Sequence, residues 1–234
     1  MTESALVDSP TSPTPEKSVA PAIRRLLIWG AGGHAKVVAD VARAMGFQVA
    51  GFLDESLARH SQSFDGAQIL GGSHWLTAPE ADRAVEVFVA IGDNAARSQC
   101  LELALREGYS VPTLIHPSAI VSPTARLASG VIVMAGAIVQ ADAVVGVGGI
   151  INTGASVDHD CVLGHCVHIA PGARLAGQVE IGDRTLVGIG AVVIPRISIG
   201  HDCIVGAGAA VTQDVLHRET VVGVPARTLP RKSD

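Results

Sequence analysis

A histidine followed directly by an aspartate, His159 and Asp160, is the strongest candidate for chemistry in this chain. A neutral imidazole with a pKa near 7 can accept a proton at physiological pH, so His159 is a candidate general base. The neighbouring carboxylate of Asp160 can fix the ring tautomer and raise its basicity. The alternative interpretation is that His159 is only a solvated turn residue.

A glycine-rich segment is the second candidate site. Residues 30–34 read GAGGH and follow the short apolar run 25–29. Gly30, Gly32 and Ala35 fit the pattern G-x-G-x-x-G/A, and Asp54 follows about 20 residues later, as in dinucleotide-binding domains. NAD binding is therefore one interpretation. The others are a nucleotide diphosphate held by backbone amides at a helix N-terminus, or a purely structural tight turn.

Residues 23–112 predict a small α/β domain that would position this glycine-rich loop. Apolar runs at 25–29, 48–53 and 85–91 predict strands, and the intervening patterns at 35–45 and 95–108 predict helices. Strands that alternate with helices indicate a parallel sheet, here one half of a dinucleotide fold. The predicted strand ends carry further polar candidates, namely Asp54, Glu55 and Asn94.

Residues 113–214 follow a six-residue period. Every sixth residue from Ile115 to Val211 is aliphatic, 17 positions without a gap, and the residue two places earlier is mostly small. Such a period drifts around an α-helix of 3.6 residues per turn, so a helix is excluded. One short strand per hexad and three hexads per coil give a parallel β-helix of roughly five and two-thirds coils. In this phase Cys161 and Cys203 point inward as packing residues, whereas His159 faces outward.

The composition and the two ends of the chain bear on which classes of function are possible. Residues 1–22 are rich in Pro, Ser and Thr and predict a flexible tail, and residues 215–234 form a C-terminal extension. The net charge of −5 does not suit nucleic-acid binding. No signal peptide is visible and no apolar run reaches about 18 residues, so we expect no membrane insertion and a cytoplasmic location.

Several motifs together resemble a known family. The chain is similar to the hexapeptide-repeat acyltransferases of nucleotide-linked amino sugars, and most of all to bacterial sugar 4-N-acetyltransferases such as the perosamine N-acetyltransferases. The matching segments are GAGGHAKVV from residue 30, AIGDN from 90, IHP from 115, INT from 151, DHDC from 158 and GVPA from 223. The resemblance implies a left-handed β-helix, a homotrimer with active sites between subunits, acetyl-CoA as donor and a nucleotide sugar held partly by the N-terminal domain.

The resemblance also implies residue roles. His159 would be the base and Asp160 its orienting acid, where the family has Glu. Substrate contacts would come from Asn152, His168, Gly32, Gly33, His34, Asp54, Glu55 and Asn94. Acetyl-CoA would contact His168, Gly177, Ile189 and Ala207.

The expected reaction is acetylation of the 4-amino group of a nucleotide-linked 4-amino-4,6-dideoxysugar, GDP-perosamine-like or UDP-linked, for surface-glycan biosynthesis such as that of lipopolysaccharide O-antigen. O-acetylation of a sialic-acid-like sugar is the alternative within the same class. A zinc enzyme similar to β-helix carbonic anhydrases is less favoured, since the paired spacing His-x4-His is absent among His159, His165, His168 and His201, and no metal is expected. A non-catalytic nucleotide-binding scaffold is the remaining alternative.

Overall fold

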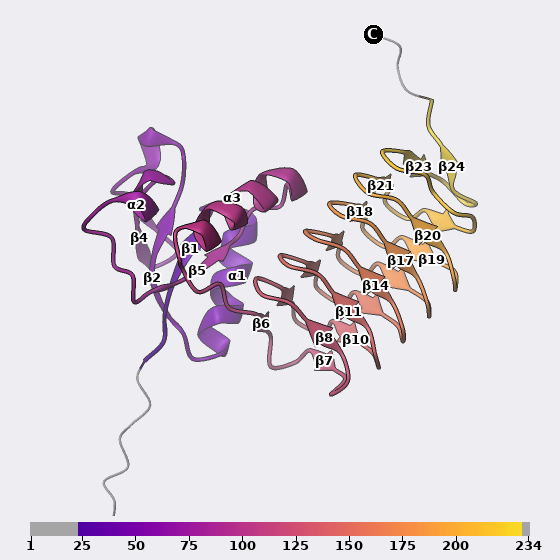
Figure 1. Cartoon of the computed structure of the whole chain (residues 1–234), viewed down its shortest axis with the longest axis horizontal. Helices are drawn as coiled ribbons and strands as arrows, with labels where there is room; N and C mark the ends of the chain where they lie inside the picture. Colours follow the sequence, from indigo (N-terminus) through magenta and orange to yellow (C-terminus); the bar gives the residue numbers. More distant parts are fainter. Residues whose placement is uncertain (1–22, 231–234) are drawn as a thin grey trace, which may run out of the picture.

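The computed structural model describes residues 23–230, which form an α/β domain followed by a long β-helix (Figure 1). The flexible tail predicted at 1–22 lies outside the described residues, as do the last four residues of the predicted C-terminal extension. The predicted fold class, a Rossmann-like half domain followed by a hexapeptide-repeat parallel β-helix, is confirmed.

The N-terminal domain is a five-stranded sheet in the order β3-β4-β2-β1-β5. Strands β1, β2, β4 and β5 are parallel, and the short β3 pairs antiparallel with β4. The sequence predicted three of these strands and missed β3 and β4. The strands are β1 (Arg25–Trp29), β2 (Gln48–Leu53), β3 (Ser63–Phe64), β4 (Ala67–Gly71) and β5 (Glu86–Val89). The helices are α1 (Gly33–Ala44), the 3-10 turn η1 (Leu57–Arg59), α2 (His74–Thr77) and α3 (Asn94–Arg106).

Alternating side chains of β1 pack into cores on opposite faces of this sheet, as the pleat of a strand requires. Leu26 and Ile28 pack in one cluster with residues of α1, including Val38. Leu27 and Trp29 pack in the other cluster with residues of α3. The sheet is therefore a layer between α1 and α3, and the carboxyl ends of β1, β2 and β5 are left free for loops.

The β-helix consists of 17 two-residue strands, β6 to β22, and each ends on one of the predicted aliphatic positions. A residue pairs with the residue eighteen places later, for example Val139 with Val157, so three hexads make one coil. The strands form three parallel sheets, which we call I, II and III in chain order.

Sheet I contains β6 (Leu114–Ile115), β9 (Ile132–Val133), β12 (Ile150–Ile151), β15 (His168–Ile169), β18 (Leu186–Val187) and β21 (Ile204–Val205). Sheet II contains β7 (Ile120–Val121), β10 (Ile138–Val139), β13 (Ser156–Val157), β16 (Arg174–Leu175), β19 (Val192–Val193) and β22 (Ala210–Val211). Sheet III contains β8 (Arg126–Leu127), β11 (Val144–Val145), β14 (Val162–Leu163), β17 (Glu180–Ile181) and β20 (Ser198–Ile199).

The interior of the β-helix is filled by one aliphatic and one small side chain per hexad. Val157 and Ala155, for example, are completely buried. Cys161 and Cys203 occupy the small position and are buried as well, so they act as packing residues. Because each coil covers its neighbour, burial at about 25 cal/mol per Å² of apolar area accumulates along the whole stack.

The chain continues the stack beyond residue 214, inside the predicted C-terminal extension. Strand β23 (Thr220–Val222) pairs parallel with β21, and β24 (Arg227–Thr228) returns antiparallel to β23. This hairpin closes the yellow end of the β-helix in Figure 1.

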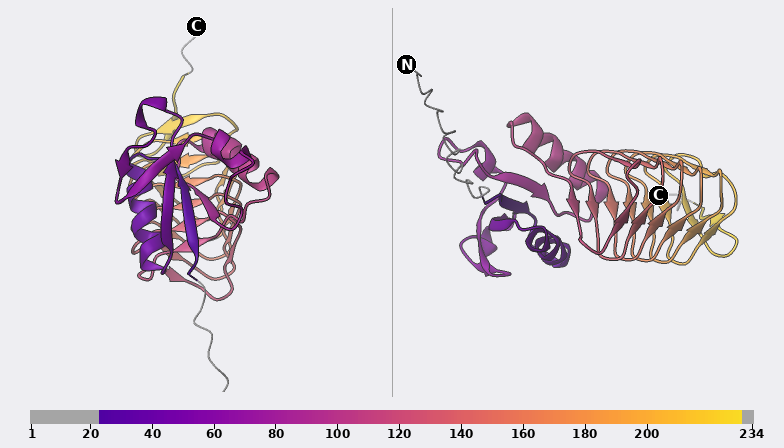
Figure 2. Two further views of the ribbon diagram at one scale, coloured as in Figure 1. Left: turned by 90° about the vertical axis from the view of Figure 1, so that its left-hand side faces the viewer. Right: turned by 90° about the horizontal axis from the view of Figure 1, so that it is seen from below.

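The N-terminal domain packs on the opposite end of the β-helix (Figures 1 and 2). Leu114, Ile132 and Ile150, the outward residues of sheet I in the first coils, join the core that contains α1. On α3, Leu101 packs close to Gly130 and Gly148 in the turns between sheets III and I. Within residues 23–230, the N-terminal domain packs on sheet I and the III–I corner, and it leaves the outward faces of sheets II and III uncovered.

Candidate active site

The candidate residues of the β-helix lie at two different corners of the triangular coil. The I–II corner is formed by the turns that connect sheet I to sheet II, and it carries Asn152, Ile189 and Ala207. The II–III corner connects sheet II to sheet III and carries His159, Asp160 and Gly177. The III–I corner closes the coil and faces α3.

At the II–III corner the imidazole of His159 is hydrogen-bonded to the carboxylate of Asp160. The distance from Nδ1 to Oδ2 is 2.8 Å. Asp160 adopts a left-handed backbone conformation with φ of 58°, at the turn position that follows the histidine. A carboxylate only accepts hydrogen bonds, so Nδ1 carries the proton and the lone pair of the neutral ring lies on Nε2. The side chain of His159 is 56% exposed, so Nε2 is accessible to a substrate.

The electrostatic environment of His159 favours a proton-accepting role. The hydrogen bond to Asp160 is the main cause of a pKa raised above the ordinary histidine value, and the charges of Asp158 and Asp160 add to it. Asp158 also accepts a hydrogen bond of 2.8 Å from the backbone amide of His159. His159 with its two neighbouring carboxylates is thus an arrangement suited to accepting a proton.

At the edge of sheet I, Asn152 and His168 form a second polar pair. The amide nitrogen Nδ2 of Asn152 lies 3.0 Å from Nε2 of His168, and Oδ1 of Asn152 accepts a hydrogen bond of 2.8 Å from Thr153 N. An amide nitrogen can only donate, so Nε2 of His168 accepts and the ring is neutral with its proton on Nδ1. This tautomer follows from the hydrogen-bond partners.

The glycine-rich loop brings His34 to the same place. The rings of His34 and His168 have centroids 6.5 Å apart, and Nε2 of His34 is buried without a hydrogen-bond partner among the described residues. Burial, followed by the positive charge of Arg97, lowers the pKa of both rings to about 4. Both rings are therefore neutral at pH 7, and His34 has an unused polar atom directed between the two domains.

The glycine-rich loop is open toward solvent at the start of α1. Gly32 is the N-cap residue of α1, and side-chain atoms placed on Gly32 or Gly33 would meet nothing within 4 Å. Gly30 has a different reason to be glycine, because its φ is 122° and a Cβ would lie 2.7 Å from Ala90 O. The loop thus combines a forced tight turn with exposed amides at a helix N-terminus, an arrangement suited to an anion.

The two acidic candidates after β2 are hydrogen-bonded to protein groups. Asp54 accepts from Ser56 N at 2.9 Å and from Arg59 Nη1 at 2.8 Å. Glu55 accepts from Ser73 N at 2.8 Å, at the start of α2. The same Arg59 donates to Ala31 O at 2.6 Å, which places a cation beside the glycine-rich loop. No sequence motif points to Arg59, because only the fold of η1 brings it to this loop.

The polar end of β5 is joined to the β-helix. Asn94 donates from Nδ2 to Arg184 O at 2.9 Å and accepts from Arg97 Nη2 at 2.7 Å. The amide nitrogen of Asn94 therefore bonds across to the β-helix, whereas its amide oxygen bonds to Arg97 within α3. Arg97, to which no sequence motif points, is only 1% exposed.

The candidate acetyl-CoA residues are divided between the same two corners. Gly177 lies beside the His159 ring at the II–III corner, whereas Ile189, 62% exposed, and Ala207 lie at the I–II corner. A single chain therefore does not bring His159 next to Asn152 and His168. Sheet II separates the two groups.

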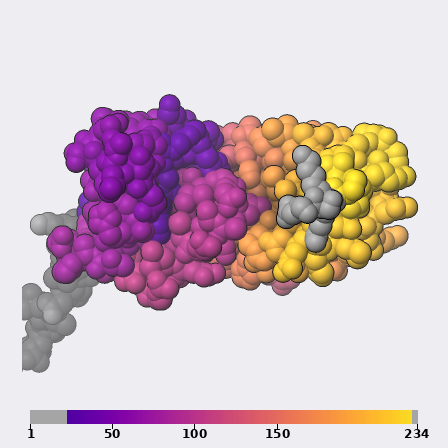
Figure 3. Space-filling view, turned by 90° about the horizontal axis from the view of Figure 1, so that it is seen from above, coloured from indigo at the N-terminus to yellow at the C-terminus, as the bar shows by residue number. Residues whose placement is uncertain are grey.

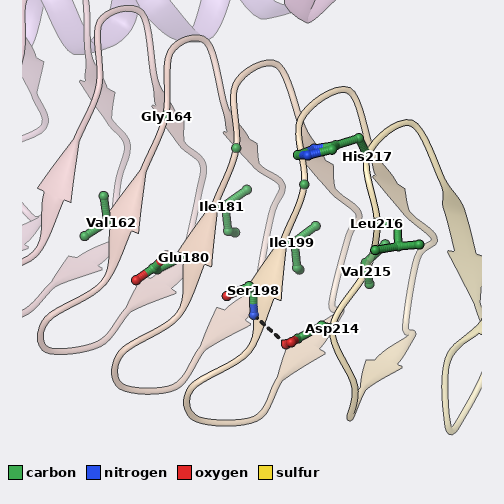
Figure 4. A pocket seen from close by; sticks show the side chains of 12 residues that line it. Val162, Gly164, Glu180, Ile181, Ser198, Ile199, Asp214, Val215, Leu216 and His217 are labelled. Atoms are coloured by element: carbon green, nitrogen blue, oxygen red, sulfur yellow. Dashed lines mark hydrogen bonds between the residues drawn. The ribbon is translucent and has the colours of Figure 1, made fainter.

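The outer surface of sheet III has a groove of about 470 Å³ (Figure 4). Val162, Glu180 and Ser198 line its floor, and Ser198 N donates to Asp214 Oδ1 at 2.8 Å. The imidazole ring of His217 lies at one end of the groove. None of the candidate site residues lines it. The space-filling view in Figure 3 shows another face of the molecule, where the N-terminal domain meets the β-helix.

Two findings concern a possible metal site and a possible membrane-spanning helix. Among residues 23–230 no cluster of three His, Cys, Asp or Glu side chains could hold a metal ion. Within the same residues, no helix is long and apolar enough to cross a bilayer.

Family comparisons define the class of protein first. Residues 25–103 match the family described as the PglD N-terminal domain, and residues 178–213 match the bacterial transferase hexapeptide repeats. The chain thus carries a PglD N-terminal domain followed by transferase hexapeptide repeats.

Individual relatives are more specific. GDP-perosamine N-acetyltransferase from Escherichia coli O157:H7 is 31% identical over 202 residues, 84% of this chain and 81% of that protein. UDP-N-acetylbacillosamine N-acetyltransferase from Bacillus subtilis (strain 168) is 40% identical over 123 residues, which span 48% of this chain and only 52% of that relative. The chain therefore belongs to the family of hexapeptide-repeat nucleotide-sugar N-acetyltransferases, and the resemblance inferred from its motifs is confirmed.

Solved structures agree with this assignment. The acetyltransferase domain of PglB from Neisseria gonorrhoeae FA1090, in complex with acetyl coenzyme A, is 41% identical with a TM-score of 0.83 and covers 89% of this chain and 100% of that chain. PerB from Caulobacter crescentus, in complex with CoA and GDP-perosamine, is 42% identical with a TM-score of 0.83 and covers 91% of this chain and 100% of that chain.

Proposed function

We propose that this protein transfers the acetyl group of acetyl-CoA to the 4-amino group of a nucleotide-linked 4-amino-4,6-dideoxysugar, with His159 as the general base. The observation that carries the proposal is the exposed His159 imidazole, hydrogen-bonded at 2.8 Å to Asp160. The fold on which this pair lies is shared over most of its length with relatives that are named perosamine N-acetyltransferases or are bound to GDP-perosamine. The reaction would take place in the cytoplasm and serve the biosynthesis of a surface glycan.

The transfer needs one proton acceptor and no covalent enzyme intermediate. The neutral amine of the sugar attacks the thioester carbonyl, and a tetrahedral intermediate forms. His159 Nε2 takes the proton from the nitrogen as the intermediate forms. The carbon–sulfur bond then breaks, the amide is left on the sugar, and the coenzyme leaves as a thiolate that accepts a proton. Asp160 stabilises the imidazolium that exists between these two proton transfers.

The N-terminal domain would hold the nucleotide. Exposed amides at the start of α1 suit the diphosphate, and Arg59 beside Ala31 O adds positive charge next to them. The buried Nε2 of His34 and the Asn152–His168 pair lie further along the same path toward sheet I. We propose that the loop amides and Arg59 contact the diphosphate, and that His34, Asn152 and His168 contact the sugar. Asp54, Glu55 and Asn94 would border the nucleoside.

The division of the candidate residues between two corners favours a homotrimer with active sites between subunits. His159 of one subunit would meet Asn152 and His168 of the next, with acetyl-CoA lying between Gly177 on one side and Ile189 and Ala207 on the other. Sheet II, which lies between these two corners, would then face the neighbouring subunits. Its outward residues Ile120 and Val192 are 63% and 41% exposed in the single chain, as an interface of apolar character requires.

The proposal is tested by incubating the protein with acetyl-CoA and a panel of acceptors while thiol release is measured. The panel contains GDP- and UDP-linked 4-amino-4,6-dideoxysugars, the matching 4-hydroxy sugars and a free sialic acid. We expect thiol release and a product heavier by one acetyl group only with a 4-amino sugar. Transfer to the sialic acid would instead support the O-acetyltransferase alternative, and nucleotide binding without any transfer would support a scaffold.

A further inference from the structure

Among residues 23–230, Arg97 is the largest of the side chains that are less than 2% exposed, and its guanidinium connects the two domains. Nε donates to Gly148 O at 2.9 Å and Nη2 donates to Cys166 O at 2.7 Å, both in turns of the III–I corner. Nη1 donates to Ile91 O at 2.9 Å and to Gly92 O at 3.2 Å, in the loop after β5. Nη2 also donates to Asn94 Oδ1 at 2.7 Å.

The acceptors around this guanidinium are neutral. Among the described residues no carboxylate forms an ion pair with Arg97, and the acid nearest in sequence, Asp93, uses Oδ1 to cap α3 by accepting from Ala96 N at 2.8 Å. Burying a charge that has no ion-pair partner is costly, and burial lowers the pKa of Arg97 although the nearby charge of Asp93 acts in the opposite direction. An apolar residue would fill the interface at a lower desolvation cost. The five directed hydrogen bonds therefore indicate that Arg97 determines how the loop after β5 is placed against the β-helix.

The groups that Arg97 joins lie on both sides of the proposed acceptor path. The segment 91–94 follows the carboxyl end of β5, the edge where open parallel sheets bind ligands. Cys166 stands two residues before His168, and Gly148 stands two residues before Ile150, the strand neighbour of His168. The planar guanidinium therefore sets the spacing between the nucleotide edge of the sheet and the strand that carries His168.

We propose that Arg97 is a positioning residue for acetyl transfer, whose guanidinium holds the loop after β5 in register with the turns that precede His168. This inference rests on the proposed function, since it assigns the register to the nucleotide sugar. Burial, and after it the positive charge of Arg97, lowers the pKa of both His34 and His168, so that the two rings are neutral hydrogen-bonding groups.

Arg97→Lys tests the proposal, because lysine keeps the charge but cannot reproduce the five-bond fork. Steady-state kinetics are measured with acetyl-CoA and the amino-sugar nucleotide that the wild type accepts. We expect KM for the nucleotide sugar to rise and kcat/KM to fall by about 10- to 100-fold, as for a misplacement of about 1 Å. KM for acetyl-CoA should rise much less, since three of its four proposed contacts, Gly177, Ile189 and Ala207, lie at other corners than the turns that Arg97 binds. If Arg97 only stabilised the fold, fewer molecules would be active, kcat would fall and both KM values would remain as in the wild type.

Leu101→Ala is the matched control, since Leu101 packs close to Gly130 and Gly148 in the same interface and its apolar side chain forms no hydrogen bond. It should leave KM for the nucleotide sugar unchanged. An equal rise of KM in Leu101→Ala would show that any loosening of the interface has this effect and would overturn the specific role of Arg97.

Hydrogen exchange on the wild type keeps the proposal testable if Arg97→Lys does not fold. With GDP or UDP as the probe, we expect slower exchange in the loop 91–94 and also in the turns 146–149 and 164–167. Protection restricted to the N-terminal domain would contradict the proposal. A wild type that transfers acetyl to no amino-sugar nucleotide would instead contradict the proposed function, so the two failures are distinguishable.

Discussion

The imidazole of His159 lies directly against Gly177, the residue at the same turn position in the next coil. A Cβ atom on Gly177 would be 2.5 Å from both Cε1 and Nε2 of the ring. The backbone of Gly177 is not in the left-handed region, so glycine is required here for space rather than for conformation. The ring of His159 thus packs on the backbone of Gly177 in the next coil. This contact and the hydrogen bond to Asp160 together fix the direction of Nε2.

Gly177→Ala should therefore displace the His159 ring and lower kcat. The methyl group has no room unless the ring rotates away, and the bond to Asp160 would break with it. We expect kcat to fall by about 10²-fold, as for other small misplacements of a catalytic group, with the β-helix intact by circular dichroism. Initial rates at saturating acetyl-CoA and acceptor measure this effect.

The matched control repeats the substitution in a His159→Ala background. His159→Ala alone should lower kcat by about 10²- to 10⁴-fold, the usual range for a lost general base. Adding Gly177→Ala should then change nothing more, since the ring it displaces is gone. Additive losses in the double variant would show that Gly177 acts independently of His159.

Asp160→Asn should move the acid side of the pH–rate profile to lower pH. As the proposed base, His159 would act in its neutral form, so the rate should rise with pH through its pKa, which the hydrogen bond to Asp160 raises. Removal of the carboxylate lowers that pKa. The plateau should also fall, because an asparagine amide can hold the wrong ring tautomer. The profile of kcat between about pH 5 and pH 9 measures both effects.

Asp142→Asn is the control for this prediction. Asp142 occupies the same turn position one coil earlier and has the same left-handed backbone, with φ of 59°. Its substitution should leave the profile unchanged. A shift of equal size in Asp142→Asn would indicate a general surface-charge effect in place of the bond to His159.

Stability should fall as the pH drops from about 6.5 to about 4, because His34 and His168 resist protonation in the folded state. Their pKa of about 4 lies below the ordinary 6.5, so in this window the unfolded chain binds protons that the folded chain does not. At about 1.4 kcal/mol per pKa unit, each ring accounts for a loss of at most ~3 kcal/mol. His168→Asn should remove part of the dependence in urea unfolding at fixed protein concentration, whereas replacement of the exposed His165 should leave it unchanged.

Val192→Glu should dissociate the proposed trimer and abolish turnover. Val192 is the outward residue of β19 in sheet II, and a carboxylate there would be buried between subunits. Val162→Glu is its control, since Val162 is the outward residue of β14 in sheet III and is similarly exposed, 47% against 41%. Sedimentation velocity should give a smaller species only for Val192→Glu. Equal behaviour of the two variants would contradict sheet II as the interface.

The β-helix could be predicted from sequence because its contacts are local and periodic. Each coil repeats the same demand for one aliphatic and one small residue, so Val139, Val157 and Leu175 identify their own strands. In contrast, β3 and β4 lie in a stretch that mixes polar and apolar residues. Ser63–Phe64 and Ala67–Gly71 form strands only because β2 offers an edge to β4, which no local pattern reveals.

The same contrast holds for the candidate site. His159 and Asp160 are adjacent in sequence, so their hydrogen bond follows from the turn that contains them. Arg97 meets Gly148 and Cys166 only after the two domains have packed together, and its surface-like position at the start of a helix gives no indication of burial. Asn94 is a similar case, since its amide partner Arg184 O is 90 residues away.

The separation of His159 from Asn152 and His168 by sheet II has a genetic consequence for the proposed assembly. A subunit that lacks the base still offers an intact I–II corner, and a subunit that lacks His168 still offers an intact II–III corner. Mixed trimers would contain some sites in which the two intact corners meet. Two alleles that are each inactive alone would then complement one another in the same cell.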